Sequence, residues 1–161
     1  MAGYGTDDGF NSWMAANGYV LPAGAPSVAI LRQRGSAYVD GMYGPRFSGA
    51  PVDPLTQERA WPRTGATLAR YGTPIPENLI PTAVIEASYF ASFQEANAPG
   101  SLNPAATSAG QVKREKVDVI EVEYFGGSGD ALADATTTIA AVEGLLAPFI
   151  ATSDLPAIFA V

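Results

Sequence analysis

Between residues 44 and 76, proline and glycine interrupt the chain so often that neither a helix nor a long strand fits. The breaks include Gly44–Pro45, Asp53–Pro54 and Trp61–Pro62, and more follow up to Pro76. Proline removes a backbone donor and fixes φ, whereas glycine favours tight turns. A loop of this length is unusual inside a compact domain and is often an interaction surface. The sequence therefore predicts a long ordered loop over residues 44–76.

The segment before this loop has the signals of two helices. Thr6 can cap the first, with acidic residues in its first turn, and Gly18 ends it. Ser27 can cap the second, which ends near Tyr43. The residues of the second helix that we expect to face the core are Val28, Leu31, Ala37 and Tyr38.

Two more helices and a β segment are predicted after the loop. Pro81 suits the first position of a third helix, whose broad apolar band indicates a central place and which ends at Pro99–Gly100. Valines alternate with charged residues over 112–125, which predicts a strand whose phase slips at Ile120. A last helix is predicted over about residues 135–147.

These elements predict a mainly α fold. We expect a small helical bundle with a β-strand or hairpin insertion at 111–125, a long Pro/Gly-rich loop and an extended C-terminal tail. Residues 1–151 form one helical domain in this prediction, and residues 152–161 form the tail. The tail is apolar although Pro156 prevents a continuous helix, so we expect it to dock on a partner. Its candidate partner-binding residues are Leu155, Pro156, Ile158, Phe159 and Val161.

Charge and composition exclude several functions. The net charge is −7, and it is unevenly distributed. Residues 1–75 hold six arginines against five acidic residues, whereas residues 76–161 hold three basic residues against eleven acidic ones. Nucleic-acid affinity comes mainly from cations that neutralise phosphates, so we expect no tight binding to DNA. Because cysteine and histidine are absent, disulfides, thiol or histidine catalysis and nearly all zinc sites are excluded.

No catalytic, metal-binding or cofactor-binding residues are predicted. Glu121 and Glu123 share one face of the predicted strand, and paired carboxylates can bind a metal or transfer protons. A solvated strand face explains them better, and likewise a hinge explains Gly126–Gly129 better than a phosphate loop does. We expect no enzyme. There is also no apolar run long enough to span a membrane, and the acidic N-terminus does not resemble a signal peptide.

Arginine and aromatic residues alternate at two places in the loop, Arg46–Phe47 and Trp61–Arg63. Such residues can stack on single-stranded nucleic acid or form the centre of a protein interface. A third interpretation is favoured: Trp61 fills the core from the loop and Arg63 ties the loop down. The protein interface is compatible with it, so both stay open.

The same stretch resembles a known family. The order of Tyr43–Gly49, Asp53–Pro54, Trp61–Ala66, Ile75–Pro76 and Ile80–Val84 is similar to small phage proteins often labelled DnaT-like single-stranded-DNA-binding proteins. These in turn resemble the head–tail connector adaptors, or head-completion proteins, of tailed phages. The resemblance covers roughly residues 1–150. Ser88–Phe90 departs from the more aliphatic pattern expected there, which could alter packing between copies in a ring.

The resemblance implies a structural adaptor of the virion neck, assembled in the host cytoplasm. It implies a ring of about twelve copies between the portal and a tail-side connector, either a stopper or a tail terminator. DNA would pass through the ring without specific binding and without any membrane contact. We expect Asp118, Glu121 and Glu123 to form an acidic face toward the DNA channel. The alternative is a single-stranded-DNA-binding accessory protein.

Overall fold

The computed structural model of the chain describes residues 2–102, 114–117, 120–123 and 139–150. The chain divides into two units, one of residues 1–102 and 138–161 and the other of residues 103–137. Among the described residues, the first unit contains four α-helices and the long loop, and the second contains a pair of strands.

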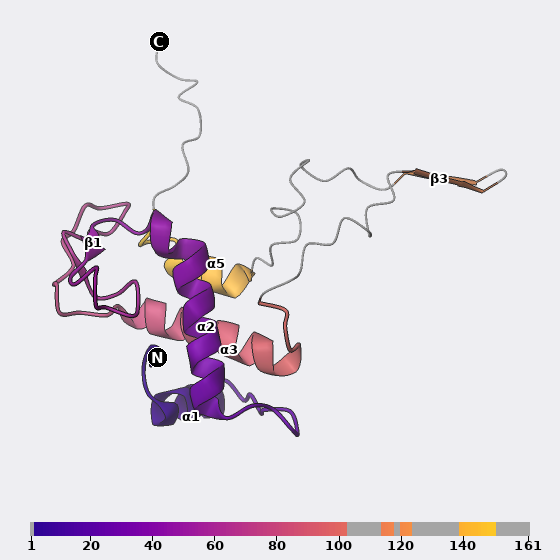
Figure 1. Cartoon of the computed structure of the whole chain (residues 1–161), viewed down its shortest axis with the longest axis horizontal. Helices are drawn as coiled ribbons and strands as arrows, with labels where there is room; N and C mark the ends of the chain where they lie inside the picture. Colours follow the sequence, from indigo (N-terminus) through magenta and orange to yellow (C-terminus); the bar gives the residue numbers. More distant parts are fainter. Residues whose placement is uncertain (1, 103–113, 118–119, 124–138, 151–161) are drawn as a thin grey trace, which may run out of the picture. The chain divides into compact units, whose positions relative to one another are not determined.

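The fold is mainly α, as predicted. The helices of the described part are α1 (Asp7–Ala16), α2 (Val28–Tyr43), α3 (Thr82–Asn97) and α5 (Ala140–Leu146). α3 is the central helix because it contacts each of the other three. α2 crosses in front of α3 in Figure 1, and α1 lies near one end of α2. The main core gathers apolar side chains from α2, the loop, α3 and the segment around α5.

The predicted helix boundaries are close to the observed ones, but the predicted capping interactions are only partly present. The Gly9 N–H donates to the Thr6 hydroxyl at 3.0 Å, so Thr6 caps α1 as expected. Ser27 precedes α2 yet makes no capping bond with its side chain. Pro81 lies one position before α3 rather than at its first residue. The described part of the last helix begins at Ala140.

One residue expected in the core of α2 is on its surface. Leu31 and Tyr38 are buried as predicted, together with Gly35 and Val39, but Ala37 is exposed. The buried positions recur every three or four residues, and residue 37 falls outside this stripe.

α2 and α3 approach each other closely at Gly35. A Cβ atom placed there would lie 2.2 Å from the Ser92 hydroxyl oxygen and 2.3 Å from the Ser88 carbonyl oxygen. Both serines are fully buried, and the Ser92 hydroxyl donates to the Ser88 carbonyl at 2.6 Å. The crossing therefore uses small side chains that satisfy their own polar groups within α3.

A smaller aromatic cluster joins α1 to α3. Phe10 is completely buried and packs edge-on against Tyr89, with 5.3 Å between the ring centroids. Trp13 adds an edge-on contact to Phe90 at 4.7 Å. Aromatic pairs in these orientations contribute beyond the area that they bury. They fix α1 on the central helix.

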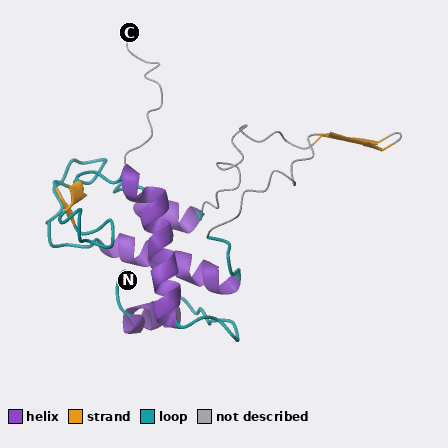
Figure 2. Cartoon of the chain, in the orientation of Figure 1, coloured by secondary structure: helices purple, strands orange, loops and turns teal. Residues whose placement is uncertain are grey.

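Figure 2 shows that the loop over residues 44–76 has little regular structure, as predicted. Main-chain hydrogen bonds nevertheless occur along it, for example from the Gln57 N–H to the Asp53 carbonyl and from the Ile75 N–H to the Ala66 carbonyl. A short 3-10 helix, η1 (Gly44–Arg46), follows α2 directly. Two-residue strands, β1 (Ala50–Pro51) and β2 (Arg63–Thr64), then pair in antiparallel fashion. Phe47 also forms a bridge with Ile150, which ties the loop to the segment after α5.

The second unit contains two antiparallel strands, β3 (Arg114–Val117) and β4 (Ile120–Glu123). The single strand predicted over 112–125 is therefore two, and β4 begins at Ile120, where the predicted phase slip lies. This outcome corresponds to the hairpin form of the expected insertion.

The crossing at Gly35 provides a stability test. Gly35→Ala should destabilise the fold by about 1–3 kcal/mol, because the added methyl group meets α3 backbone atoms that cannot move away. Thermal or denaturant unfolding would measure the change.

Gly41 is a matched control in the same helix. It is exposed, and a Cβ atom there would meet nothing within 4 Å. Gly41→Ala should stabilise the protein by about 0.5–1 kcal/mol through helix propensity. Equal stabilisation by both substitutions would contradict the close crossing.

Candidate functional site

Arg63 lies inside the loop and organises its backbone. It is 6% exposed, and its guanidinium donates to four main-chain carbonyl oxygens. Those oxygens belong to Phe47 (3.3 Å), Ser48 (2.8 Å), Gly49 (2.7 Å) and Ala60 (3.1 Å). Burial lowers the pKa of Arg63 from its ordinary value. An arginine has a rigid fork of donors, so one side chain fixes both sides of the loop.

The aromatic residues of the loop lie in the core beside Arg63. Trp61 is 2% exposed and packs edge-on against Phe47, with 5.5 Å between the centroids, and against Phe149 at 6.3 Å. Phe47 is also buried, and the Arg63 guanidinium lies 6.0 Å from the centre of its ring. Trp61, Phe47 and Arg63 thus face the interior, whereas Arg46 lies at the surface and pairs with Glu143.

A second network of polar groups joins the loop to α2 and to the N-terminal segment. The buried Tyr4 hydroxyl donates to a carboxylate oxygen of Asp40 and accepts a hydrogen bond from the main-chain N–H of Trp61 at 3.1 Å. Arg59 donates to the other Asp40 oxygen at 3.4 Å and to the Ala2 carbonyl at 2.8 Å. Burial raises the pKa of Asp40, and the contacts with Tyr4 and Arg59 oppose that rise.

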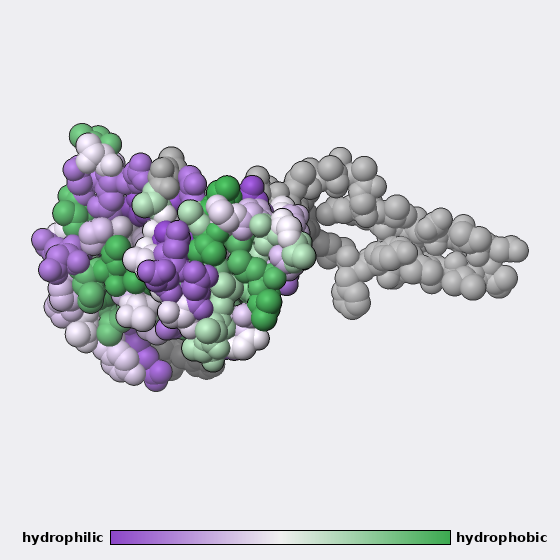
Figure 3. Space-filling view, turned by 90° about the horizontal axis from the view of Figure 1, so that it is seen from below, coloured by the Kyte–Doolittle hydropathy of each residue, from purple (hydrophilic) through white to green (hydrophobic). Residues whose placement is uncertain are grey.

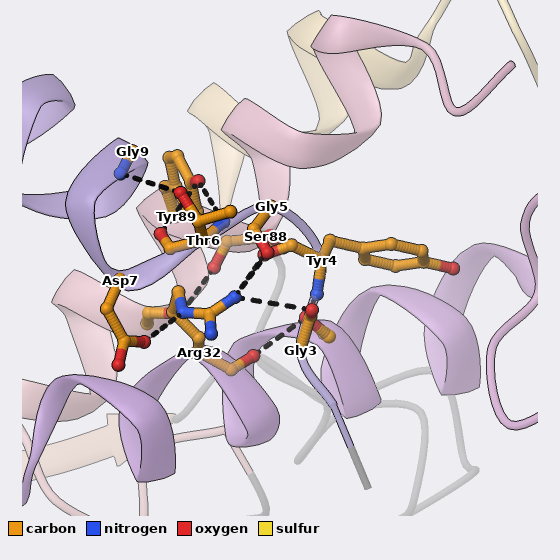
Figure 4. A network of polar contacts seen from close by, with 11 residues as sticks. Gly3, Tyr4, Gly5, Thr6, Asp7, Gly9, Arg32, Ser88 and Tyr89 are labelled. Carbon is orange, nitrogen blue, oxygen red and sulfur yellow. Dashed lines mark hydrogen bonds and ion pairs between the residues drawn. The ribbon is translucent and has the colours of Figure 1, made fainter.

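Arg32 holds the N-terminal segment against α2. Its guanidinium donates to the carbonyl oxygens of Gly3, Tyr4 and Gly5, and it pairs with Asp7 at 2.7 Å. Figure 4 shows the guanidinium at the centre of this network. The segment before α1 is therefore fastened by contacts to its main chain, as the loop is by Arg63.

Of the six arginines in residues 2–102, five have internal partners. Arg34 pairs with Glu95 at 3.0 Å, in addition to the contacts of Arg32, Arg46, Arg59 and Arg63 given above. Arg70 differs: it makes no hydrogen bond or ion pair with any residue that the structure describes. Its guanidinium lies 5.8 Å from the centre of the Tyr71 ring, and both residues are exposed.

The outer surface of the loop carries apolar side chains. Leu55 is 94% exposed and Val52 is 47% exposed, both between β1 and β2. The loop backbone there is held by bonds from the Gln57 side chain to the carbonyls of Arg59 and Pro62. Figure 3 shows apolar and polar residues intermixed over the face that it presents. Exposed apolar groups on a fixed backbone are suited to contact with another macromolecule.

Among the described residues, no group of three or more acidic residues is placed to hold a metal ion. An open pocket of about 380 Å³ lies between the N-terminal segment and the loop, lined by Tyr4, Arg59, Trp61 and Ile80 among others. In this pocket Arg59 and Tyr4 are both bonded to Asp40. Among the described helices, none has the length and apolar character needed to cross a membrane.

Several predicted site residues cannot be placed by this structure. The tail residues Leu155, Pro156, Ile158, Phe159 and Val161 lie outside the described residues, and so does Asp118. Glu121 and Glu123 lie on β4, and the strand register sets them opposite Lys116 and Arg114. Each of these two acidic residues therefore has a basic residue as its cross-strand neighbour. The acidic face predicted from the sequence included only the acidic residues of this segment.

Sequence reasoning missed the network of Tyr4, Asp40 and Arg59, because these residues are far apart in the chain and share no motif. It also missed Arg70 and Tyr71. Their signal was present, since an arginine and a tyrosine precede Gly72 in a segment rich in turn residues.

The fold and the loop geometry define a class: a small, mainly α protein whose long loop is held by a buried arginine, Arg63. Within that class, residues 3–160 match the family described as "Putative DnaT-like ssDNA binding protein". The chain belongs to this family. No curated protein and no solved structure matches it. The family description agrees with the single-stranded-DNA alternative and gives no support to the phage neck adaptor.

Replacing Arg63 tests its role in the loop. Arg63→Lys should destabilise the fold by about 1–3 kcal/mol, because one ammonium cannot reach the four carbonyl oxygens and leaves some buried without a donor. Arg46→Lys is the control, since Arg46 and Glu143 are both partly exposed and form a surface pair. Its effect should stay below about 1 kcal/mol. Equal effects in denaturant unfolding would mean that Arg63 does not hold the loop.

Proposed function

We propose that this chain is a non-catalytic accessory protein that binds single-stranded DNA. The observation that carries this proposal is the family match, which extends over residues 3–160 and thus over almost the whole chain. A match of this extent includes the helices, the loop and the second unit together. Single-stranded-DNA binding is the alternative interpretation of the sequence, and it takes the place of the phage neck adaptor that the sequence favours.

The charges of the chain constrain how such binding works. The net charge is −7, and five arginines of residues 2–102 already have internal partners. Within residues 2–102 few cations therefore remain to neutralise phosphates, and the negative net charge makes long-range attraction to DNA weak. Binding of this kind is local, modest in affinity and independent of sequence, with stacking as a main contribution.

A salt titration tests the proposed function. The affinity for a labelled oligothymidylate should be measurable at low salt, and log K should fall with log salt at a slope of about −0.7 for each phosphate neutralised. Because few cations are free, we expect a slope shallower than about −2. The measurement is fluorescence anisotropy at several salt concentrations. Lack of binding at the lowest salt would overturn the proposal.

A second candidate is the adaptor of a tailed-phage neck. The specific observation in its favour is that Leu55 and Val52 are exposed on a hydrogen-bonded loop, in a chain whose net charge disfavours DNA. In this proposal the chain is a structural subunit of the virion neck. Its partners are the portal, a tail-side connector and copies of itself in a ring of about twelve.

Truncation of the tail tests this second candidate. Removing residues 153–161 should leave the melting temperature nearly unchanged but abolish co-assembly with a portal ring, because the apolar tail is the proposed docking segment. Light scattering and electron microscopy of mixtures with and without the portal would measure it. Unfolding of the truncated chain, or normal co-assembly without the tail, would contradict the docking role.

A further inference from the structure

The turn between Leu68 and Thr73 has a fixed backbone beneath an exposed tip. The Leu68 N–H donates to the Thr73 carbonyl at 2.9 Å, and the Gly72 N–H donates to the Leu68 carbonyl at 2.7 Å. Gly72 has a φ of 64°, which a glycine adopts without strain. The Ala69 N–H also donates to the Pro148 carbonyl at 2.8 Å, so the turn is anchored to the segment after α5.

Two unusual side chains meet at the tip of this turn. Arg70 is the arginine of residues 2–102 without an internal hydrogen bond or ion pair. Tyr71 is 71% exposed and is the only aromatic residue of the described part that is largely exposed. The remaining described aromatic side chains are buried or partly buried in the cores. A cation and a ring that the fold itself does not use are thus adjacent on a rigid support.

We propose that Arg70 and Tyr71 form the contact of this chain with a single strand of DNA. The guanidinium carbon of Arg70 lies 5.8 Å from the centre of the Tyr71 ring, and the high exposure of that ring leaves area on which a nucleobase can stack. Arg70 contacts a neighbouring phosphate of the same strand. A base that is paired and stacked inside a duplex cannot also stack on Tyr71, so the contact favours single strands. This inference rests on the proposed DNA binding and assigns it to two residues.

The chemistry at the tip predicts how each residue contributes. Stacking of one base on an aromatic side chain changes affinity by about 5- to 150-fold. Loss of one phosphate contact makes the salt slope shallower by about 0.7. Because both side chains are exposed, neither substitution should change the melting temperature.

The experiment measures binding of the full-length chain to labelled oligothymidylate at low salt. Tyr71→Ala should weaken binding by at least about 5-fold, and Tyr71→Phe should restore it because the ring is kept. Arg70→Ala should weaken binding and reduce the salt slope. The matched controls are Arg34→Ala, an exposed arginine that pairs with Glu95, and Val20→Ala, an exposed residue outside the loop, and both should bind as the unsubstituted chain does.

The outcomes separate the site from the function. If the unsubstituted chain binds and Tyr71→Ala binds equally well, the assignment to this turn is wrong while DNA binding stands. If the unsubstituted chain does not bind, both fail. A duplex of the same length should bind more weakly than the single strand, and equal binding of the two would overturn the stacking contact.

Discussion

The close crossing of α2 and α3 is the constraint on which the rest of the structure depends. At Gly35 the two helices approach so nearly that a methyl group has no room, and the buried serines opposite keep their hydroxyls bonded within α3. α1 and α5 pack on this pair, and the loop begins where α2 ends. A larger residue at the crossing would move α2, and with it the position of Tyr43 and the start of the loop.

Three arginines hold the segments that are neither helix nor sheet. Arg63 donates to main-chain carbonyl oxygens, whereas Arg32 and Arg59 each donate to carbonyl oxygens and to a carboxylate. A carbonyl oxygen belongs to the backbone, so these contacts fix the course of the chain where no helix or sheet does so. The same arrangement leaves Arg32, Arg59 and Arg63, three of the six arginines of residues 2–102, with little exposed surface.

The elements could be predicted from the sequence more fully than the contacts between them. Thr6 was recognised as a cap from its place before Asp7 and Asp8, because capping is a local interaction. Ser27 has the same local signal, yet its side chain makes no capping bond, so residue type alone did not decide the outcome. The proximity of Tyr4, Asp40 and Arg59 depends on how three segments meet in space, which periodicity and composition do not encode. The family was indicated by the loop motifs, but those motifs hold the loop together and do not reveal its ligand.

Because Arg63 points inward, the residues that fix the loop backbone differ from the residues on the outer surface of the loop. The backbone course of residues 47–63 is set by contacts inside the loop, while side chains such as Leu55 on its rim contribute little to that course. Substitutions at the rim can therefore accumulate without reshaping the loop, as they do in binding loops presented by a rigid framework. Relatives with the same framework could recognise different partners by changing only these outer residues. For the same reason, the rim is a suitable place to graft a foreign recognition sequence onto this protein.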